Sequence, residues 1–511
     1  MKRNYFVFCL LALFGSLNMQ AYDFEVDGIY YTVTDTASAS AKVAVAAGEE
    51  LYEGSVAIPA TVNIDGKAYS VTAIGEKAFY YCKGLTSITI PESVKEIGSN
   101  AFRNCAGLST LTLPAGVTSI GYSAFFGCSG LTSFTIPAGV TTIEPYTFFG
   151  CKRIPSINLN GITKIGGSAF ASCVALDNVT LPEALTEIGS YLFQGCTGLK
   201  TISIPANVKN IGDAAFQDCT GLTSVTIPEG VVQIGRATFE DCTGLTALNL
   251  PSTVKSISYS TFWNCNNLAS IAVADGNPVY DSRNNCNAII ETYTVDAKTG
   301  KQALKLIVGC KNTVIPDGVE EIGSYAFLKC TGLSTLDIPA SVSSLGTAAF
   351  MGSGLTTINV PESITIIDED CFAACENLAS VTLSSKVTKI EDGAFASCPN
   401  LKAFYCNAEK CPTATADAFF DTSVETATLY VPNSSVGTYT LTAPWSLFGT
   451  ISSEGNLVAP EKDSATAIAA LQGAGKVQQV YNLSGQQSSR IQRGINVIRM
   501  NDGTTRKVLV K

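Results

Sequence analysis

The sequence predicts a mostly β repeat solenoid that is built from units of about 23 residues and has a β-rich segment at each end. Two observations predict this class. The phrase IPEGVVQIGRATFEDCTGLTALNLP, residues 227–251, recurs with small changes along most of the chain. Apolar residues make up 46% of the 511 residues and charged residues only 15%, which excludes a disordered chain. One unit cannot bury its own apolar face, so the units must stack around a shared core.

Phenylalanines mark one position of each unit, and nearly every step between them is 23 residues. The markers are Phe79, Phe102, Phe125, Phe148, Phe170, Phe193, Phe216, Phe239, Phe262, Phe327, Phe350, Phe372 and Phe395, with Phe419 as a degenerate last member. Two steps, from Phe148 and from Phe350, are 22 residues long, and the second begins with MGSGL, which lacks the usual cysteine. A period this regular indicates one structural unit repeated along a single axis.

Each unit reads V-x-x-I-G-x-x-A-F-x-x-C-x-G-L-x-x-I-x-I-P. The spacing of Leu222, Val225 and Ile227 predicts a short strand whose last two apolar residues point inward. Pro228 lacks an N–H group and is expected to end this strand. The glycine after V-x-x-I is expected to permit a tight reversal of the backbone toward the Ala-Phe turn.

The amino-terminal residues predict a signal peptide. Lys2 and Arg3 precede an apolar run over residues 5–17, which is too short to span a bilayer, and Ala21 is a plausible cleavage residue. No later stretch approaches 18 apolar residues, so we expect no membrane span. The protein is therefore expected to be secreted or held at the cell surface after cleavage.

The remaining chain divides by composition and by the repeat. The predicted divisions are a signal peptide at 1–21, an amino-terminal cap at 22–70, a solenoid at 71–455 with an irregular hairpin unit at about 274–311, a linker at 456–476, and a carboxyl-terminal β appendage at 477–511. Within the irregular unit, residues 288–295 and 303–308 are predicted strands joined by a polar turn. Trp445 and Phe448 are expected to seal the last core of the solenoid.

The composition excludes several kinds of chemistry. The formal charge is −10 and no cluster of Lys or Arg is visible, so a nucleic-acid partner is not expected. The chain has no histidine, which excludes Ser/His/Asp and Cys/His catalysis and removes the commonest metal ligand. We therefore expect no cofactor and no metal.

Twelve cysteines occupy one position of the repeat. They are Cys82, Cys105, Cys128, Cys151, Cys173, Cys196, Cys219, Cys242, Cys265, Cys330, Cys375 and Cys398. A metal or redox site would need C-x-x-C pairs or histidines, and neither occurs, so we interpret this set as a structural ladder of buried, unbridged thiols. Five further cysteines lie off the ladder, and the pairs Cys286–Cys310 and Cys406–Cys411 are candidates for disulfides in an oxidising compartment.

Three features are candidates for a functional surface. The acidic cluster Asp368, Glu369 and Asp370 is either a solvated turn or a calcium or catalytic carboxylate site. The outward residues of the predicted strands, such as Thr201 and Ser203, form a face rich in hydroxyl groups. This face is either a consequence of strand propensity or a binding surface, and it lacks an aromatic ladder, so we expect it to be a poor carbohydrate platform.

Aromatic side chains gather instead beside the marker phenylalanines. The candidate binding residues are Tyr122, Phe126, Tyr146, Phe149 and, farther along, Trp263. Other units carry polar residues such as Arg103 and Gln217 beside the marker, which implies exposure. The aromatic residues therefore either form an exposed patch for a protein partner or pack between neighbouring turns.

The A-F-x-x-C-x-x-L-x-x-I-x-I-P signature over residues 71–431 resembles the leucine-rich repeat superfamily, and within it the BspA-like or Treponema pallidum type. This resemblance implies a secreted or surface protein of a host-associated bacterium that binds a macromolecule, such as host extracellular matrix, mucin or another surface protein. It implies no enzyme activity. The alternatives are a structural component of the cell envelope and, more remotely, a carboxylate-based hydrolase.

The last residues carry a second resemblance. Residues 477–511 contain short predicted strands separated by Gly485, Gly494 and Gly503, and they end on an apolar and basic strand. This pattern resembles the carboxyl-terminal sorting domains of secreted Bacteroidetes proteins. The alternative is a small β appendage without a sorting role.

Overall fold

The structure is a computed structural model of the 511-residue chain. It describes residues 22–45, 51–258 and 260–453, and also the backbone of four strands between residues 477 and 510. The predicted signal peptide at 1–21 and linker at 456–476 lie outside the described residues. The chain divides into two compact units, residues 1–162 and 163–511, which are described one at a time.

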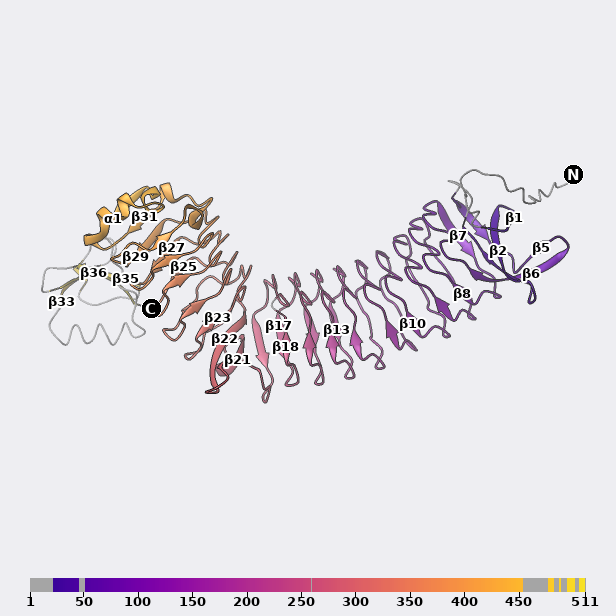
Figure 1. The fold of residues 1–511 in the computed structure, drawn as a ribbon, viewed down its shortest axis with the longest axis horizontal. Helices are drawn as coiled ribbons and strands as arrows, with labels where there is room; N and C mark the ends of the chain where they lie inside the picture. The colour runs from indigo at the N-terminus through magenta and orange to yellow at the C-terminus, as the bar shows by residue number, and fades with distance from the viewer. Residues whose placement is uncertain are drawn as a thin grey trace. The chain divides into compact units, whose positions relative to one another are not determined.

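Both units are β-solenoids whose coils follow the 23-residue period (Figure 1). In unit 2 the V-x-x-I segment of each coil forms a two-residue strand, and β12 (Glu187–Ile188), β14 (Asn210–Ile211), β16 (Gln233–Ile234) and β18 (Ser256–Ile257) pair in parallel. The Gly212 N–H donates to the Ile188 carbonyl at 2.8 Å, which continues this ladder into the next turn. The sequence did not predict this ladder because two residues are too few for a visible strand pattern.

In unit 2, segments 176–181 and 333–338 are not strands, whereas the other predicted L-x-x-I-x-I segments form strands. They include β13 (Thr201–Ser203) with β15 (Ser224–Thr226), β17 (Ala247–Leu250) with β19 (Ser270–Val273), and the five-stranded parallel sheet β25 (Thr357–Asn359), β27 (Ser380–Leu383), β29 (Ala403–Cys406), β31 (Thr428–Tyr430) and β32 (Thr450–Ser452). The prediction is wrong for segments 108–114 and 131–137 of unit 1, which are not strands. Hydrogen bonds of the Phe turns and of the two-residue strands hold the coils together there.

Unit 1 begins with a mixed sheet. Strands β1 (Phe24–Val26), β2 (Ile29–Asp35) and β3 (Ser40–Val43) are antiparallel, and β3 pairs in parallel with β6 (Lys67–Ile74), which β5 (Thr61–Ile64) flanks. The sheet continues into the coil strands β8 (Glu96–Ile97) and β9 (Ser119–Ile120), while β4 (Gly54–Ala57) pairs with β7 (Leu85–Thr89). The ring of Tyr52, just before β4, lies 4.8 Å from that of Phe79, so this segment covers the first ring of the core.

The marker phenylalanines stack through the core of each unit. In unit 1 the Phe79, Phe102 and Phe125 rings follow one another at centroid distances of 5.1 and 5.6 Å with nearly parallel planes. In unit 2 the Phe216 ring lies 5.6 Å from Phe193 and 5.4 Å from Phe239. These rings are fully buried, so each regular coil contributes one ring to an apolar column.

The turns around most markers contain left-handed backbone on both sides of the ring. In the coil of Phe216 these residues are Ala214 (φ 52°) and Asp218 (φ 59°), two positions before and two after the marker. No Val, Ile or Thr has a positive φ among the described residues, because a β-branched side chain is strained in this region. The Phe216 N–H then donates to the Thr238 carbonyl of the next coil at 2.9 Å.

The glycine after V-x-x-I serves a different purpose from the one the sequence predicted. Gly212 and Gly235 do not have a positive φ, so the prediction that glycine is needed there for a tight reversal of the backbone is wrong. A Cβ at Gly212 would lie 2.6 Å from the Ser190 backbone nitrogen, and one at Gly235 would lie 2.7 Å from that of Asp213. Glycine is required because adjacent coils approach each other backbone to backbone at this point.

The irregular segment of unit 2 contains an antiparallel hairpin of β21 (Ala288–Asp296) and β22 (Lys301–Gly309), preceded by β20 (Tyr280–Asp281). Strand β22 then pairs in parallel with β23 (Glu321–Ile322), which pairs with β24 (Ser344–Leu345). A Cβ at Gly309 would lie 2.0 Å from the Phe327 ring. The coil that ends at Gly309 therefore contributes no ring to the stack.

The carboxyl-terminal part of unit 2 is closed by aromatic residues. The Trp445 ring lies 5.7 Å from Phe419, and its indole N–H donates to the Pro412 carbonyl at 3.0 Å. The short helix α1 (Val436–Leu441) carries the buried Tyr439, whose hydroxyl donates to the Ala408 carbonyl at 2.8 Å. The last strands, β33 (Val477–Tyr481), β34 (Gln487–Ser488), β35 (Gly494–Met500) and β36 (Thr505–Val510), form an antiparallel sheet.

Among the residues that the structure describes, no helix is both long and apolar enough to cross a membrane. The remaining short strands belong to the two-residue ladder. They are β10 (Thr142–Ile143) in unit 1, and β11 (Lys164–Ile165), β26 (Ile366–Ile367), β28 (Lys389–Ile390) and β30 (Thr413–Ala414) in unit 2.

Candidate binding surfaces

The structure brings four of the predicted binding residues together in unit 1. The Phe126 and Phe149 rings stack at a centroid distance of 4.5 Å with an angle of 4° between their planes. The Tyr146 ring lies 5.6 Å from Tyr122 and 6.1 Å from Phe149, so it connects the two pairs. These four residues are called the aromatic surface below.

The aromatic surface is partly packed and partly exposed. Tyr122 is 44% exposed, whereas Phe126, Tyr146 and Phe149 are half-buried against one another. The two interpretations offered by the sequence therefore both apply, because the rings pack between neighbouring coils and still present area to solvent. Preordered aromatic rings of this kind lose little conformational freedom when a partner binds.

Arg103 extends the aromatic surface by one coil. Its guanidinium carbon lies 3.9 Å from the centre of the Phe126 ring, which is a cation–π contact. The backbone bond from the Asn104 N–H to the Phe126 carbonyl shows that Arg103 and Phe126 occupy the same position of adjacent coils. In the sequence, Arg103 indicated only that the position beside the marker phenylalanine is exposed. Its contact with Phe126 could not be predicted, because it depends on both the register of the repeats and the orientation of the side chain.

The same position in unit 2 carries polar side chains. The Gln194 amide donates to the side-chain oxygen of Gln217 at 2.9 Å, and the Gln217 amide donates to a Glu240 carboxylate oxygen at 2.9 Å. Burial raises the pKa of Glu240 and the nearby Asp241 carboxylate raises it further. This row therefore tolerates either polar or aromatic side chains without a change of the backbone.

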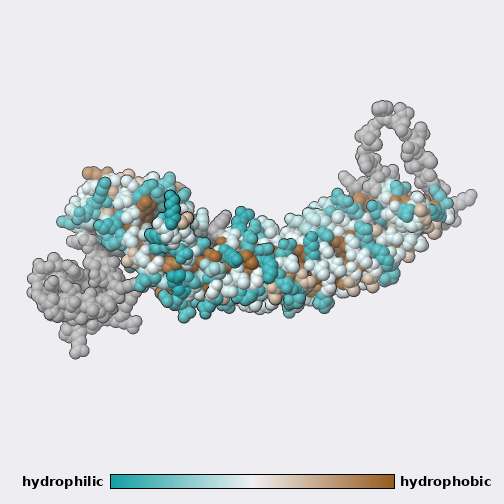
Figure 2. Space-filling model, turned by 60° about the horizontal axis from the view of Figure 1, so that its bottom comes forward, coloured by the Kyte–Doolittle hydropathy of each residue, from teal (hydrophilic) through white to brown (hydrophobic). Residues whose placement is uncertain are grey.

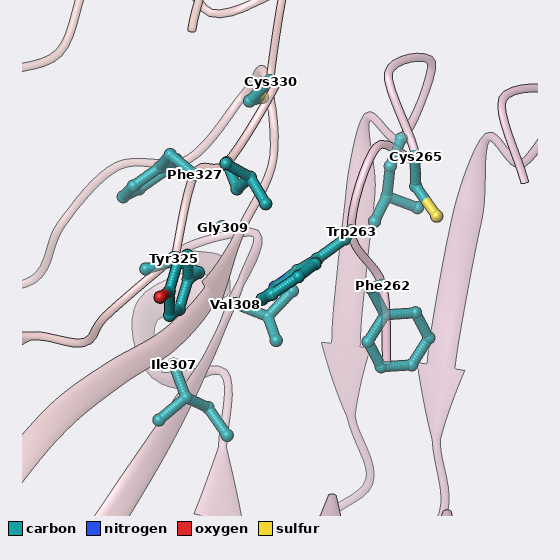
Figure 3. A pocket seen from close by; sticks show the side chains of 12 residues that line it. Phe262, Trp263, Cys265, Ile307, Val308, Gly309, Tyr325, Phe327 and Cys330 are labelled. Atoms are coloured by element: carbon teal, nitrogen blue, oxygen red, sulfur yellow. The ribbon is translucent and has the colours of Figure 1, made fainter. Parts of the chain in front are cut away.

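Trp263 lies apart from the aromatic surface, in unit 2. Its ring packs 4.8 Å from that of Tyr325, and both line a small pocket between Phe262 and Phe327 (Figure 3). The pocket forms where Gly309 contributes no ring to the stack. The sequence predicted Trp263 as a candidate but not the pocket, which depends on how the hairpin segment enters the solenoid.

The hydroxyl-rich strand face contains an aromatic pair that the sequence missed. Tyr405 on β29 and Tyr430 on β31 are register partners and stack at 4.5 Å with an interplanar angle of 9°. Burial raises the pKa of the Tyr405 hydroxyl. The face thus carries an aromatic pair at its carboxyl-terminal end, and Thr382 on β27 is buried, although the same strand position was predicted to point outward. The two tyrosines are 25 residues apart, which hid the pair from a search at the 23-residue period.

The ladder cysteines are buried and unbridged, and their thiols bond to neighbouring coils. The Cys219 thiol donates to the carbonyl of Phe193 at 3.1 Å, and the Cys128 thiol donates to that of Phe102 at 3.0 Å. Burial raises the pKa of Cys128 to about 12. A thiol held protonated in this way is a poor nucleophile and a poor metal ligand, so the geometry favours a structural role.

The disulfides considered for the off-ladder cysteines are absent, because all four candidates are free. The Cys310 thiol donates to the Asn287 carbonyl at 3.3 Å. The Cys406 sulfur lies 3.2 Å from the Tyr439 hydroxyl, and burial raises the pKa of Cys411 to about 11. The Cys310 and Cys406 sulfurs therefore contact residues 23 and 33 positions away in the sequence and are not bridged.

The acidic cluster has the geometry of a turn. Glu369 is exposed, and Asp370 has left-handed backbone, as expected two positions before Phe372. Burial raises the pKa of Asp368, and the charges of Glu391 and Glu321 raise it further. The described residues contain no group of three acidic or cysteine side chains arranged to hold a metal ion.

The coils, the ring stack and the thiol ladder define a leucine-rich repeat solenoid. The family model described as BspA type leucine rich repeat region (6 copies) matches residues 72–200, 186–295 and 297–439. The chain therefore belongs to the BspA-type leucine-rich repeat family.

Solved structures of bacterial repeat proteins resemble this chain. A leucine-rich repeat protein from Bacteroides ovatus is 25% identical with a TM-score of 0.55, over 80% of this chain and 100% of that one. A leucine rich cell surface protein from Faecalibacterium prausnitzii is 27% identical with a TM-score of 0.46, over 87% and 97% of the two chains. A Treponema pallidum leucine-rich repeat protein is 28% identical with a TM-score of 0.31, over 43% and 89%. The comparison with curated proteins gave no significant match.

Proposed function

We propose that this protein is secreted or displayed on the cell surface and binds another protein there through the aromatic surface. The observation that carries the proposal is the cluster of Tyr122, Phe126, Tyr146 and Phe149, with Tyr122 44% exposed and the other three half-buried. Exposed aromatic residues in an ordered cluster supply much of the binding energy at protein interfaces. The family assignment and the apolar run near the amino terminus support the surface location.

The rest of the exterior is consistent with binding of a partner protein at one small area of the surface. On the face drawn in Figure 2, hydrophobic residues form small areas that are separated by polar ones. The partner classes that fit are host extracellular matrix proteins, mucin and other surface proteins.

We propose no catalytic role, because a chain without histidine and with strongly protonated thiols lacks the usual nucleophile and base pairs. The terminal sheet β33–β36 is proposed to serve in sorting to the cell surface.

The test is a binding array of residues 22–511 against immobilised matrix proteins and mucin. Replacing Phe126 and Phe149 with Gln should preserve the fold, because Gln217 occupies the same position in unit 2. Affinity for the partner that the array identifies should fall at least tenfold, which is about 1.4 kcal/mol.

The matched control replaces Thr201 and Ser203 on the hydroxyl-rich strand face with Lys. If this control abolishes binding and the Phe126/Phe149 variant does not, the binding surface is the strand face instead. A protein that binds no component of the array, while remaining associated with the cell envelope, would indicate a structural role.

A further inference from the structure

The guanidinium group of Arg103 is held in place but is incompletely satisfied. One terminal nitrogen, Nη1, donates to the Asn100 side-chain oxygen at 3.3 Å and, at 3.5 Å, to the Ser123 hydroxyl. The Nε atom is buried and makes no hydrogen bond, and within the described part of the chain Nη2 has no partner either. Because the buried Nε is out of a partner's reach, Nη2 is the donor that remains for a carboxylate, and the guanidinium is already oriented by its other contacts.

No acidic side chain of the described residues neutralises Arg103. The nearby Lys77 is paired with Glu76 at 3.4 Å, and Lys83 lies 5.6 Å from the centre of the Tyr81 ring. Arg103 forms no such ion pair within the described segments, where its partners are the Phe126 ring and the neutral side chains of Asn100 and Ser123. In the turns that carry the aromatic surface, residues 121–128 and 144–151, the one acidic residue is the exposed Glu144. The aromatic surface therefore carries an uncompensated positive charge at one edge.

We infer that the aromatic surface recognises an acidic and aromatic peptide segment. An Asp or Glu carboxylate of the partner binds the Arg103 guanidinium, and an adjacent aromatic or aliphatic side chain packs on Phe126 and Phe149. This inference rests on the proposed function and specifies the partner of the same site. A peptide fits better than a sulfated glycan, because polyanions require several clustered cations and Arg103 is the one cation recorded in contact with these rings among the described residues.

A phage-displayed library of random dodecapeptides, selected on residues 22–511, tests the inference. Selection on the wild-type protein should enrich peptides that place Asp or Glu next to an aromatic residue. Selection on Arg103→Gln should retain aromatic residues and lose the acidic ones. Selection on the Phe126→Gln, Phe149→Gln double variant should enrich neither.

The strongest peptide from the wild-type selection then serves for a double-mutant cycle. Changing its acidic residue to the amide should weaken binding at least tenfold on the wild type and less than twofold on Arg103→Gln. Arg153→Gln, which makes the same change at an exposed arginine of unit 1, should alter affinity less than twofold. Thermal unfolding of each variant checks that unit 1 remains folded.

The possible failures are distinguishable. Aromatic peptides without acidic enrichment would overturn this inference and leave the proposed protein-binding function in place. Enrichment of neither kind on the wild type would count against both. Retention on heparin that is lost in Arg103→Gln but not in Arg153→Gln, together with no peptide enrichment, would show that the site takes an acidic glycan, and the peptide assignment would be wrong.

Discussion

At the residue scale, the ladder position requires a small hydrogen-bond donor and not cysteine as such. Ser353 replaces cysteine in the MGSGL unit and lies 3.4 Å from the Cys375 sulfur. Thr422 occupies the position in the coil of Phe419, and its hydroxyl donates to the Phe395 carbonyl at 2.6 Å. In the sequence these two units only lack the ladder cysteine, but in the structure a hydroxyl group takes the place of the thiol at that position. Burial of the remaining thiols explains why their pKa values rise, since the thiolate is disfavoured without water.

This burial predicts a loss of stability at alkaline pH. The thiol pKa is raised from 9.0 to about 12 in Cys196, Cys330 and Cys398, so these thiols stay protonated in the folded protein. Above pH about 9 the unfolded chain releases protons that the folded chain retains, so the free energy of unfolding falls as pH rises toward 12. Each thiol contributes a slope of about 1.4 kcal/mol per pH unit in that window.

The measurement is urea unfolding at several pH values between 8 and 11. Reductant is present, and circular dichroism monitors the loss of structure. Replacing the three cysteines with Ser, as at position 353, should make the slope shallower by up to about 4 kcal/mol per pH unit. An unchanged slope in the triple variant would show that other groups cause the alkaline loss.

At the element scale, each coil depends on its neighbours through the ring, the turn bonds and the glycine contact. The Phe216 ring is fully buried between two others, and its turn is bonded to the next coil through the Thr238 carbonyl. A coil cannot be repacked alone, because the glycines let adjacent backbones approach too closely for a side chain. Local damage is therefore expected to affect the adjacent coils most.

Phe216→Ala should lower the free energy of unfolding of unit 2 by roughly 3–5 kcal/mol, because it removes a ring from a packed column. Denaturant unfolding, with hydrogen exchange to locate the damage, measures the effect. Phe420→Ala is the matched control: this side chain is 66% exposed, so its loss should change stability by no more than about 0.5 kcal/mol. Equal effects of the two substitutions would contradict the ring stack as the source of stability.

At the scale of the whole molecule, the solenoid needs covers for the ends of its apolar column. Tyr52 lies against the Phe79 ring at the start of unit 1. In unit 2 the last marker, Phe419, is covered by Trp445 and by Phe448, whose ring lies 5.4 Å away. Terminal coils without such covers would expose apolar surface to water, so these residues stabilise each unit as a whole.

Trp445→Ala should therefore open the carboxyl-terminal coils of unit 2. We expect a loss of roughly 3–5 kcal/mol, with faster hydrogen exchange in β29 and β31 and no change in β13 and β15. Leu447→Ala is the control, because this neighbour is 54% exposed and should have little effect. Uniform acceleration across unit 2 would mean that the solenoid unfolds as a single cooperative body.

The sequence by itself determined the period, the buried phenylalanines, the place of the cysteines and the closing role of Trp445. These features follow from local patterns, because every coil meets the same packing requirement and repeats the same solution. It also identified the residues of the aromatic surface, since Phe126 and Phe149 are one period apart. It did not explain the coil glycines, whose role lies in contacts between backbones.

Only the tertiary structure decided which side chains are in contact where the repeat length departs from 23 residues, or where the contact depends on the orientation of a side chain. The Tyr405–Tyr430 pair crosses a two-residue slip, and the pocket beside Trp263 exists because a hairpin brings Gly309 to a position that otherwise holds a ring. Arg103 lies over Phe126 because its side chain turns along the row toward the next coil. Such contacts depend on the three-dimensional course of adjacent coils, which a one-dimensional repeat does not contain.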